Sequence, residues 1–269
     1  MLKTACIQLT SGDNMAENIE KIEAMVASAA KNGAQFVATP ENVFLMENPK
    51  SEKILYKVEE HPAVQAAAKM AKENKIWLLV GSVAVASGDE NKSYNRSILF
   101  NPNGEIVAQY DKIHLFDVEV DDGQVYKESA KIKAGNKAVA VETPLCKLGM
   151  TICYDLRFPH LYRALAKAGA NIIAVPAAFT QKTGEAHWHI LLRARAIETG
   201  CFIIAPAQTG THANGRQTFG HSLIVDPWGV IIADAGTNEG IIYADIDFSK
   251  VRKTRNDIPS LQHDRDFSF

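Results

Sequence analysis

The chain has 269 residues, and its 29 Lys and Arg residues nearly balance its 31 Asp and Glu residues, which gives a formal net charge of −2. This balance provides no general electrostatic attraction to nucleic acids or to an anionic membrane surface. Because no apolar run is long enough to span a bilayer, and because segment 1–9 is too short and too polar for a signal peptide, we expect a cytoplasmic protein with no nucleic-acid or membrane partner.

The first half of the chain alternates predicted strands with predicted helices. Apolar residues recur at helical spacing over 14–31, and a short apolar run lies on each side of this segment. A strand, a helix and a second strand in this order favour parallel pairing in an α/β fold. The turn at 101–104, Asn-Pro-Asn-Gly, predicts a hairpin. The predicted strands are 2–9, 35–38, 76–83, 97–100 and 106–110, and the predicted helices are 14–31 and 61–74.

The second half continues the alternation. Segments 111–138 and 207–219 are predicted loops, and long loops inside compact domains are usually functional. Because no repeat, low-complexity tract or linker is present, we expect one domain over 1–269. The predicted strands are two short ones within 139–152, then 171–175, 201–205, 220–225, 230–233 and 240–246, and the predicted helices are 159–168, 185–199 and one beginning at Ser249.

Cys153 stands where a predicted strand gives way to a predicted helix. Pro159 suits the first turn of that helix. Backbone N–H groups at such a junction can stabilise a thiolate, or the oxyanion that forms after a thiolate attacks a carbonyl. A free cysteine in an apolar strand is more often a core residue, so this position alone leaves both interpretations open. The other three cysteines show neither C-x-x-C nor zinc-ligand spacing, so we expect no metal and no cofactor: Cys6, Cys146 and Cys201.

Glu41 and Lys112 also follow predicted strands, and ligands of α/β sheets gather at the carboxyl ends of strands. Attack on an amide carbonyl needs a nucleophile, a base and a donor or cation for the oxyanion. A buried glutamate can have a raised pKa and serve first as base and then as acid. Taken singly, a residue in the position of Glu41 is more often a turn residue, and one in the position of Lys112 is more often a surface charge.

Three ordered segments resemble the carbon–nitrogen hydrolase (nitrilase) superfamily, and the resemblance extends over nearly the whole chain. Their order and spacing are far more specific than any one of them. The resemblance implies an α/β fold with a four-layer α-β-β-α sandwich and a small-molecule amide substrate. The segments are Pro40-Glu41-Asn42, then 110–117 (YDKIHLFD) and 152–159 (ICYDLRFP).

The resemblance also implies a role for each site residue. Glu41 would be the general base and acid, Lys112 would support the oxyanion, and Cys153 would be the nucleophile. The backbone N–H of Tyr154 would be the second oxyanion donor. Glu128 corresponds to a second family glutamate that orients the lysine.

The residues that follow Cys153 resemble the branch that holds deaminated glutathione amidases and omega-amidases. By this resemblance Arg157 and Phe179 would line the acyl pocket, and a guanidinium suits a substrate carboxylate. We therefore expect hydrolysis of an amide of a small 2-oxo dicarboxylic acid, with deaminated glutathione preferred. The alternatives are an omega-amidase acting on 2-oxoglutaramate, and a non-catalytic member that binds a metabolite or a partner protein.

A homodimer or higher homo-oligomer is expected from the resemblance and from two apolar predicted helices, 159–168 and 185–199. These helices carry many apolar side chains for surface elements, although the same side chains would also suit packing against the chain's own sheet. The candidate contacts are His160, Leu161, Leu165, Ile190, Leu191 and Ile197.

Overall fold

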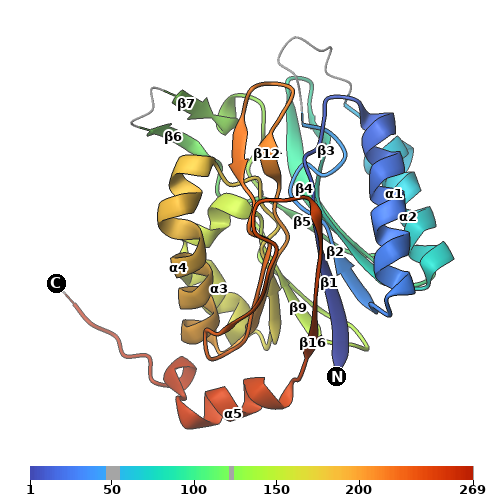
Figure 1. Cartoon of the computed structure of the whole chain (residues 1–269). Helices are drawn as coiled ribbons and strands as arrows, with labels where there is room; N and C mark the ends of the chain where they lie inside the picture. Colours follow the sequence, from blue (N-terminus) through green and yellow to red (C-terminus); the bar gives the residue numbers. More distant parts are fainter. Residues whose placement is uncertain (47–54, 121–123, 269) are drawn as a thin grey trace.

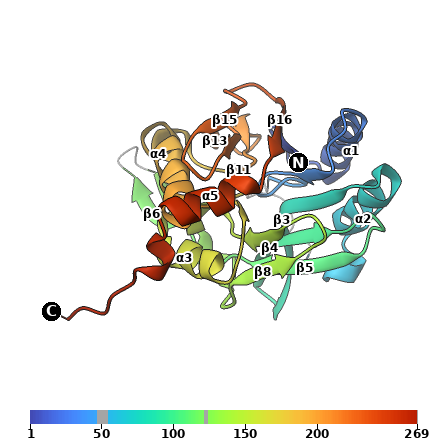
Figure 2. The same ribbon diagram turned by 90° about the horizontal axis from the view of Figure 1, so that it is seen from below.

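The computed structural model describes residues 1–46, 55–120 and 124–268. Two six-stranded sheets lie face to face, with helices on the outer face of each (Figures 1 and 2). This arrangement confirms the expected four-layer α-β-β-α sandwich. The first sheet is covered by α1 (Met15–Lys31) and α2 (Pro62–Asn74), and the second by α3 (Pro159–Lys167) and α4 (Gln181–Thr199).

The first sheet combines parallel and antiparallel pairing. In spatial order its strands are β16 (Gly240–Ile246), β1 (Leu2–Gln8), β2 (Phe36–Ala38), β3 (Trp77–Asp89), β4 (Lys92–Phe100) and β5 (Ile106–Asp111). The first three strands in sequence, β1, β2 and β3, pair in parallel, as the strand–helix–strand order predicted. The hairpin predicted at the turn 101–104 joins β4 to β5 and is confirmed, and a longer hairpin of β3 and β4 precedes it, so the three strands form an antiparallel meander.

The second sheet has the same design. In spatial order its strands are β15 (Ile231–Asp234), β14 (Leu223–Val225), β11 (Phe202–Ala205), β10 (Ile172–Ala174), β9 (Lys147–Met150) and β8 (Val139–Glu142). Three of them, β9, β10 and β11, are parallel, and antiparallel strands flank them. Each sheet therefore has a parallel centre whose strand ends point to one edge, where ligands collect.

Both predicted long loops contain short hairpins, which corrects the sequence prediction. The loop predicted over 111–138 holds β6 (Asp117–Val120) and β7 (Gln124–Lys127), and the loop over 207–219 holds β12 (Thr209–Thr211) and β13 (Gln217–Phe219). Strands of three or four residues give too few alternations for a period-2 pattern to stand out. The last helix is α5 (Ser249–Asp257), and among the described residues no helix is both long and apolar enough to cross a membrane.

Helix α4 begins at Gln181, four residues before the predicted start at 185. Gly184, a residue type that is unfavourable in helix interiors, lies inside the helix. A Cβ at Gly184 would lie 2.4 Å from Cβ of Phe219, so the glycine allows close approach between α4 and β13.

Alternation along β1 divides the core into two clusters. Cys6 packs in a cluster with the second sheet, whereas Ile7 packs with the residues under α1 and α2. Two of the candidate dimer contacts, Leu161 and Leu165, are only 4% and 1% exposed and belong to the first cluster. That part of the expectation was wrong, because these side chains face the chain's own sheet.

Gly81 lets β3 approach the segment that leads to Glu41. A Cβ at this position would lie 2.1 Å from the Thr39 carbonyl oxygen and 2.3 Å from that of Pro40. We expect Gly81→Ala to lower the free energy of unfolding by about 1–3 kcal/mol, a usual cost of forcing extra volume into a packed site. Urea unfolding measures this change. Gly240→Ala is the matched control, because its added Cβ meets no atom within 4 Å; equal losses in both variants would contradict the argument.

Candidate active site

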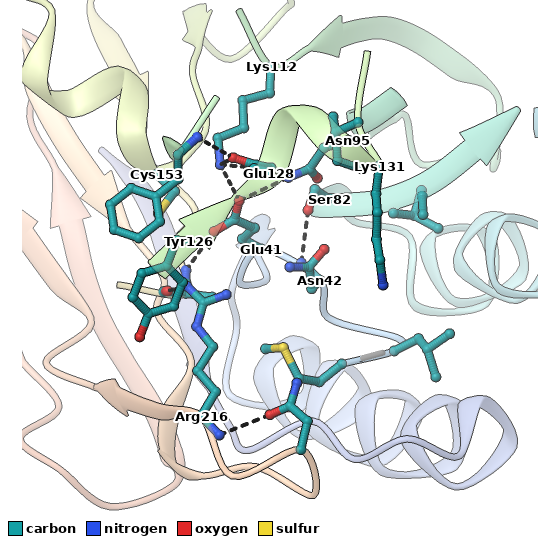
Figure 3. Close-up of a pocket in the computed structure, with 18 of the residues that line it drawn as sticks. Glu41, Asn42, Ser82, Asn95, Lys112, Tyr126, Glu128, Lys131, Cys153 and Arg216 are labelled. Carbon is teal, nitrogen blue, oxygen red and sulfur yellow. Dashed lines mark hydrogen bonds and ion pairs between the residues drawn. The ribbon is translucent and has the colours of Figure 1, made fainter. Parts of the chain in front are cut away.

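A cavity of about 930 Å³ lies where the segments that follow β2, β5 and β9 meet (Figure 3). These segments come from both sheets, so the face-to-face packing of the sandwich builds the cavity. Of the residues that the sequence analysis assigned to the site, all except Arg157 line the cavity. They are Glu41, Lys112, Glu128, Cys153, Tyr154 and Phe179.

Glu41 is buried and held by contacts to both of its carboxylate oxygens. Its Oε2 accepts a hydrogen bond of 2.8 Å from the backbone N–H of Ala178, and its Oε1 accepts one of 2.9 Å from Nδ2 of Asn95. Its backbone carbonyl accepts a third hydrogen bond, of 3.0 Å, from the side chain of Gln208. These contacts fix the orientation of the carboxylate before any ligand arrives.

Lys112 lies between two carboxylates. Its Nζ is 2.8 Å from Oε1 of Glu41, and it is 3.0 Å and 2.9 Å from the two carboxylate oxygens of Glu128 (Figure 3). The lysine is only 2% exposed, and the side chain of Glu128 is 17% exposed. The backbone N–H of Phe116 donates to Glu128 at 2.6 Å, which orients this second acid.

Cys153 opens the 3-10 turn Cys153–Arg157, which connects the end of β9 to α3. Its backbone has a φ of 47°, in the left-handed region that side-chain-bearing residues rarely adopt. Its N–H donates to the carbonyl of Pro176 at 2.9 Å, which helps to hold this conformation. The Glu41 carboxylate lies close enough to the Cys153 thiol to raise the pKa of the thiol. The structure therefore brings Glu41, Lys112 and Cys153 together.

Asp155 joins the segment of Lys112 to the turn of Cys153. One of its oxygens accepts from the Tyr110 hydroxyl at 2.7 Å and from the Ile152 N–H at 2.8 Å. The other accepts from the backbone N–H of His114 at 3.1 Å and lies 2.7 Å from Nδ1 of the same residue. This fully buried acid thus fixes the end of β5 against the residues that carry the thiol.

The pKa of Glu41 is lowered, which corrects the expectation of a raised value. Burial by itself raises the pKa of this carboxyl. The Lys112 ammonium, at 2.8 Å, and the positive charge of Arg216 outweigh the effect of burial. Glu41 is therefore ionised at neutral pH and able to accept a proton.

The thiol and the lysine are both in their protonated forms. Burial raises the pKa of Cys153, and the Glu41 carboxylate raises it further, while Lys112 and Arg216 compensate only in part. Burial lowers the pKa of Lys112, but the charges of Glu128 and Glu41 outweigh this effect and the net shift is upward. The resting site therefore combines a thiol, a carboxylate and an ammonium, and the thiol proton must leave during attack.

Tyr154 and Phe179 line the cavity, whereas Arg157 is not among the lining residues. The Arg157 guanidinium lies 5.8 Å from the ring centroid of Tyr154 and 5.4 Å from that of Phe179. It also contacts Nδ1 of His187 at 3.3 Å. Arg157 therefore lies against two rings of the cavity lining, and its role toward a substrate stays a prediction.

Two further cavity residues were missed by the sequence analysis. Asn95 donates to Glu41 and, at 3.3 Å, to Glu128, but it lies in a part of β4 that the predicted strand 97–100 left out. Arg216 donates to the carbonyl of Ala178, and among the described residues its buried Nε has no hydrogen-bond partner. Arg216 lies in the segment 207–219, which was predicted to be a functional loop, and this was the available signal.

This arrangement can attack an electrophilic carbon and stabilise the resulting negative charge. A thiol lies beside an ionised carboxylate that can take its proton, and an ammonium lies beside both. The lysine is also a fixed cation for an oxyanion. Among the described residues, one group of side chains has metal-ligand geometry, and it lies outside this cavity. It consists of His189, His221 and Asp234.

The chain is similar to known proteins over nearly its whole length. Residues 3–256 match the family model for carbon–nitrogen hydrolases. The chain is 43% identical over 267 residues to the deaminated glutathione amidase of Synechocystis sp. (strain PCC 6803 / GT-S), and the match covers 96% of each protein. It is 37% identical over 269 residues to nitrilase homolog 2 of Dictyostelium discoideum, which covers 99% of this chain and 81% of that protein.

A solved structure has the same fold. Nit3 of Saccharomyces cerevisiae, described as a member of branch 10 of the nitrilase superfamily, superposes with a TM-score of 0.86 and 30% sequence identity. The match covers 97% of this chain and 96% of Nit3.

Replacing Glu41 should make the cysteine more acidic. Glu41→Gln removes the negative charge that raises the pKa of Cys153. Because the thiolate is the form that reacts with iodoacetamide, we expect the pH dependence of Cys153 alkylation to shift to lower pH. Peptide mass spectrometry measures the rate. The control is Glu142→Gln, whose side chain is 74% exposed. An unchanged or upward shift in Glu41→Gln would show that Glu41 does not control the thiol.

Proposed function

This chain belongs to the carbon–nitrogen hydrolase family, and we propose that it is an amidase that cleaves a small amide through a thioester on Cys153. The observation that supports this most directly is that Glu41, Lys112 and Cys153 meet inside one cavity, with Lys112 hydrogen-bonded to Glu41. A buried thiol beside a carboxylate and an ammonium has little value for packing, but it supplies a nucleophile, a base and an oxyanion partner.

In the first half of the reaction, Glu41 takes the thiol proton while the Cys153 sulfur attacks the amide carbon. The carbonyl oxygen becomes an oxyanion, which the Lys112 ammonium and the backbone N–H of Tyr154 stabilise. Glu41 then gives its proton to the amide nitrogen, the C–N bond breaks, and the amine leaves. The acyl group remains on sulfur as a thioester. Glu128 keeps Lys112 in position during these steps.

The second half uses the same groups in reverse. Glu41 takes a proton from a water molecule, and the water oxygen attacks the thioester carbon. Lys112 and Tyr154 again stabilise the oxyanion. The C–S bond breaks, the carboxylic acid leaves, and the Cys153 sulfur recovers the proton from Glu41. Because Glu41 is ionised at rest, it is ready for the first proton transfer without prior deprotonation.

The substrate of this reaction is deaminated glutathione, which would give 2-oxoglutarate and cysteinylglycine. The name of the relative in Synechocystis supports this choice. The cavity volume of about 930 Å³ is typical of pockets that hold drug-sized ligands. A substrate with a dipeptide leaving group therefore has room. The acyl carboxylate needs a fixed cation, and Arg157 is the predicted one, with Arg216 a second cation in the cavity lining.

The alternative substrate is 2-oxoglutaramate, which has the same acyl part and releases ammonia. A non-catalytic role in binding a metabolite or a partner protein would not require Glu41, Lys112 and Cys153 to meet in one cavity. Phe179, which lines the cavity beside the cysteine segment, would contact the acyl chain with either substrate.

Turnover of the two amides separates these functions. We expect the purified protein to have a higher kcat/KM for deaminated glutathione than for 2-oxoglutaramate, measured as cysteinylglycine and ammonia release. Cys153→Ala removes the nucleophile and should turn over neither compound while keeping the wild-type circular dichroism spectrum. A preference above about tenfold for 2-oxoglutaramate, about 1.4 kcal/mol of barrier, would identify an omega-amidase. No turnover of either compound by the wild type would favour the binding role.

Dimerisation through the exposed face of α4 is a further part of the proposal. Ile190 and Ile197 on this helix are 68% and 52% exposed, and Trp228 and Val230 in the neighbouring turn are 55% and 51% exposed. A Cβ on Gly229 would lie 2.6 Å from Ile197, so the turn packs directly against the helix. Clustered exposed apolar side chains of this kind mark interaction sites.

We expect light scattering at micromolar concentration to give at least twice the chain mass for the wild type. Ile197→Glu places a charge on the α4 face and should shift the protein toward the monomer. Ile106→Glu is the control, because Ile106 lies in the edge strand β5 of the other sheet. A wild-type protein that is already monomeric, or an equal effect of both variants, would reject this face as the interface.

A further inference from the structure

Three potential metal ligands converge outside the active-site cavity. His189 lies on α4, His221 between β13 and β14, and Asp234 at the end of β15. Nε2 of His189 is 3.2 Å from Oδ2 of Asp234, and Nδ1 of His221 is 3.0 Å and 3.2 Å from the two oxygens of the same carboxylate. All three ligand atoms lie within 4.8 Å of one another, and none of the three residues lines the cavity of Cys153.

The backbone holds His221 in an unusual conformation. Its φ is 52°, in the left-handed region, although it is not a glycine. Its N–H donates to the carbonyl of Gly236 at 2.7 Å, and its carbonyl accepts from Nε1 of Trp188 at 2.8 Å. Its ring stacks on Phe219, with the centroids 4.5 Å apart. Strained non-glycine residues that their surroundings hold in place occur preferentially at functional sites.

The carboxylate is held as firmly as the imidazole. Oδ1 of Asp234 accepts a hydrogen bond of 2.8 Å from the backbone N–H of Gly236, the residue that also accepts from the His221 N–H. The Asp234 side chain is 33% exposed, and those of His189 and His221 are 31% and 23% exposed. The three ligands are thus half-buried, positioned by the backbone, and open to an ion from solvent.

We propose that His189, His221 and Asp234 bind a first-row divalent transition metal ion such as Zn²⁺. Two imidazole nitrogens and one carboxylate oxygen are a donor set that suits zinc and its neighbours rather than Mg²⁺ or Ca²⁺. In a tetrahedral zinc site with metal–ligand distances of about 2.0–2.1 Å, ligand atoms lie about 3.3 Å apart. The histidine–aspartate separations of 3.0–3.2 Å already match this edge.

The simplest competing interpretation is an ion pair of Asp234 with histidine. One imidazolium is enough to neutralise one carboxylate, and a second imidazolium at this spacing would repel the first. Two neutral rings avoid this repulsion, and a shift of the proton to the other ring nitrogen turns a lone pair of each ring toward the ion. The metal would therefore join α4, β15 and the segment before β14.

The test is titration of the protein with Zn²⁺ as chloride, followed by isothermal titration calorimetry and thermal unfolding. Cys153→Ala is the background for every variant, because the cavity thiol is itself a zinc ligand. We expect one Zn²⁺ ion per chain and a rise in Tm with Zn²⁺ concentration, because an ion that binds the folded state stabilises it. His189→Gln and Asp234→Asn should each abolish the site and the rise in Tm. The protein for this titration is prepared without a histidine tag, because such a tag would itself bind Zn²⁺.

The matched control is His263→Ala, which removes an exposed histidine remote in sequence from the three ligands. It should keep both the stoichiometry and the rise in Tm. No Zn²⁺ binding to the background protein, or binding that survives both His189→Gln and Asp234→Asn, would overturn the proposal. If one of these variants does not fold, the other decides the result, because they change different elements. Loss of turnover has no part in the readout, so failure of the proposed amidase function would leave this result unaffected.

Discussion

An ammonium group that is buried away from water loses several kcal/mol of solvation, which neighbouring carboxylates must replace. Glu41 and Glu128 both do this for Lys112, and their oxygens lie within 3.0 Å of its nitrogen. Burial and the Glu41 carboxylate both raise the pKa of Cys153 and favour its protonated form, and Lys112 and Arg216 compensate only in part. Glu41, which helps to hold the lysine, therefore also favours a resting thiol, and the nucleophile depends on a base.

This electrostatic balance requires the sandwich, because its members come from different layers. Glu41 and Lys112 follow strands of the first sheet, and Cys153 follows a strand of the second. The two halves are joined by polar contacts rather than by apolar packing alone. The Ala178 N–H donates to the Glu41 carboxylate. Asp155 accepts from Tyr110, at the end of β5, and from Ile152, which follows β9. Relative movement of the sheets would therefore disturb the proton acceptor and the nucleophile together.

The parts of the structure that the sequence could predict are those that depend on local pattern. The periodicity of 14–31 predicted α1, and the strand–helix–strand order predicted parallel β1 and β2. Convergence of Glu41, Lys112 and Cys153 followed from the resemblance, since no spacing rule links residues so far apart. Asn95 and Arg216 have no comparable signal, because an asparagine in a strand and an arginine in a loop are common in many roles. The lowered pKa of Glu41 depends on a 2.8 Å distance that only the folded chain contains.

The pairing of β1 with β16 has a consequence for the synthesis of this protein. Leu2 aligns with Ile246 and Gln8 with Gly240. One edge of β1 therefore stays unpaired until β16 has left the ribosome. Until then β1 presents unpaired backbone groups along a nearly fully buried, largely apolar segment, which is a template for association with other chains. Pairing between strands so far apart in sequence is also slow, because the chain loses the entropy of loop closure before the stabilising contacts form. During synthesis, β1 is therefore exposed to association with other chains until β16 has been made.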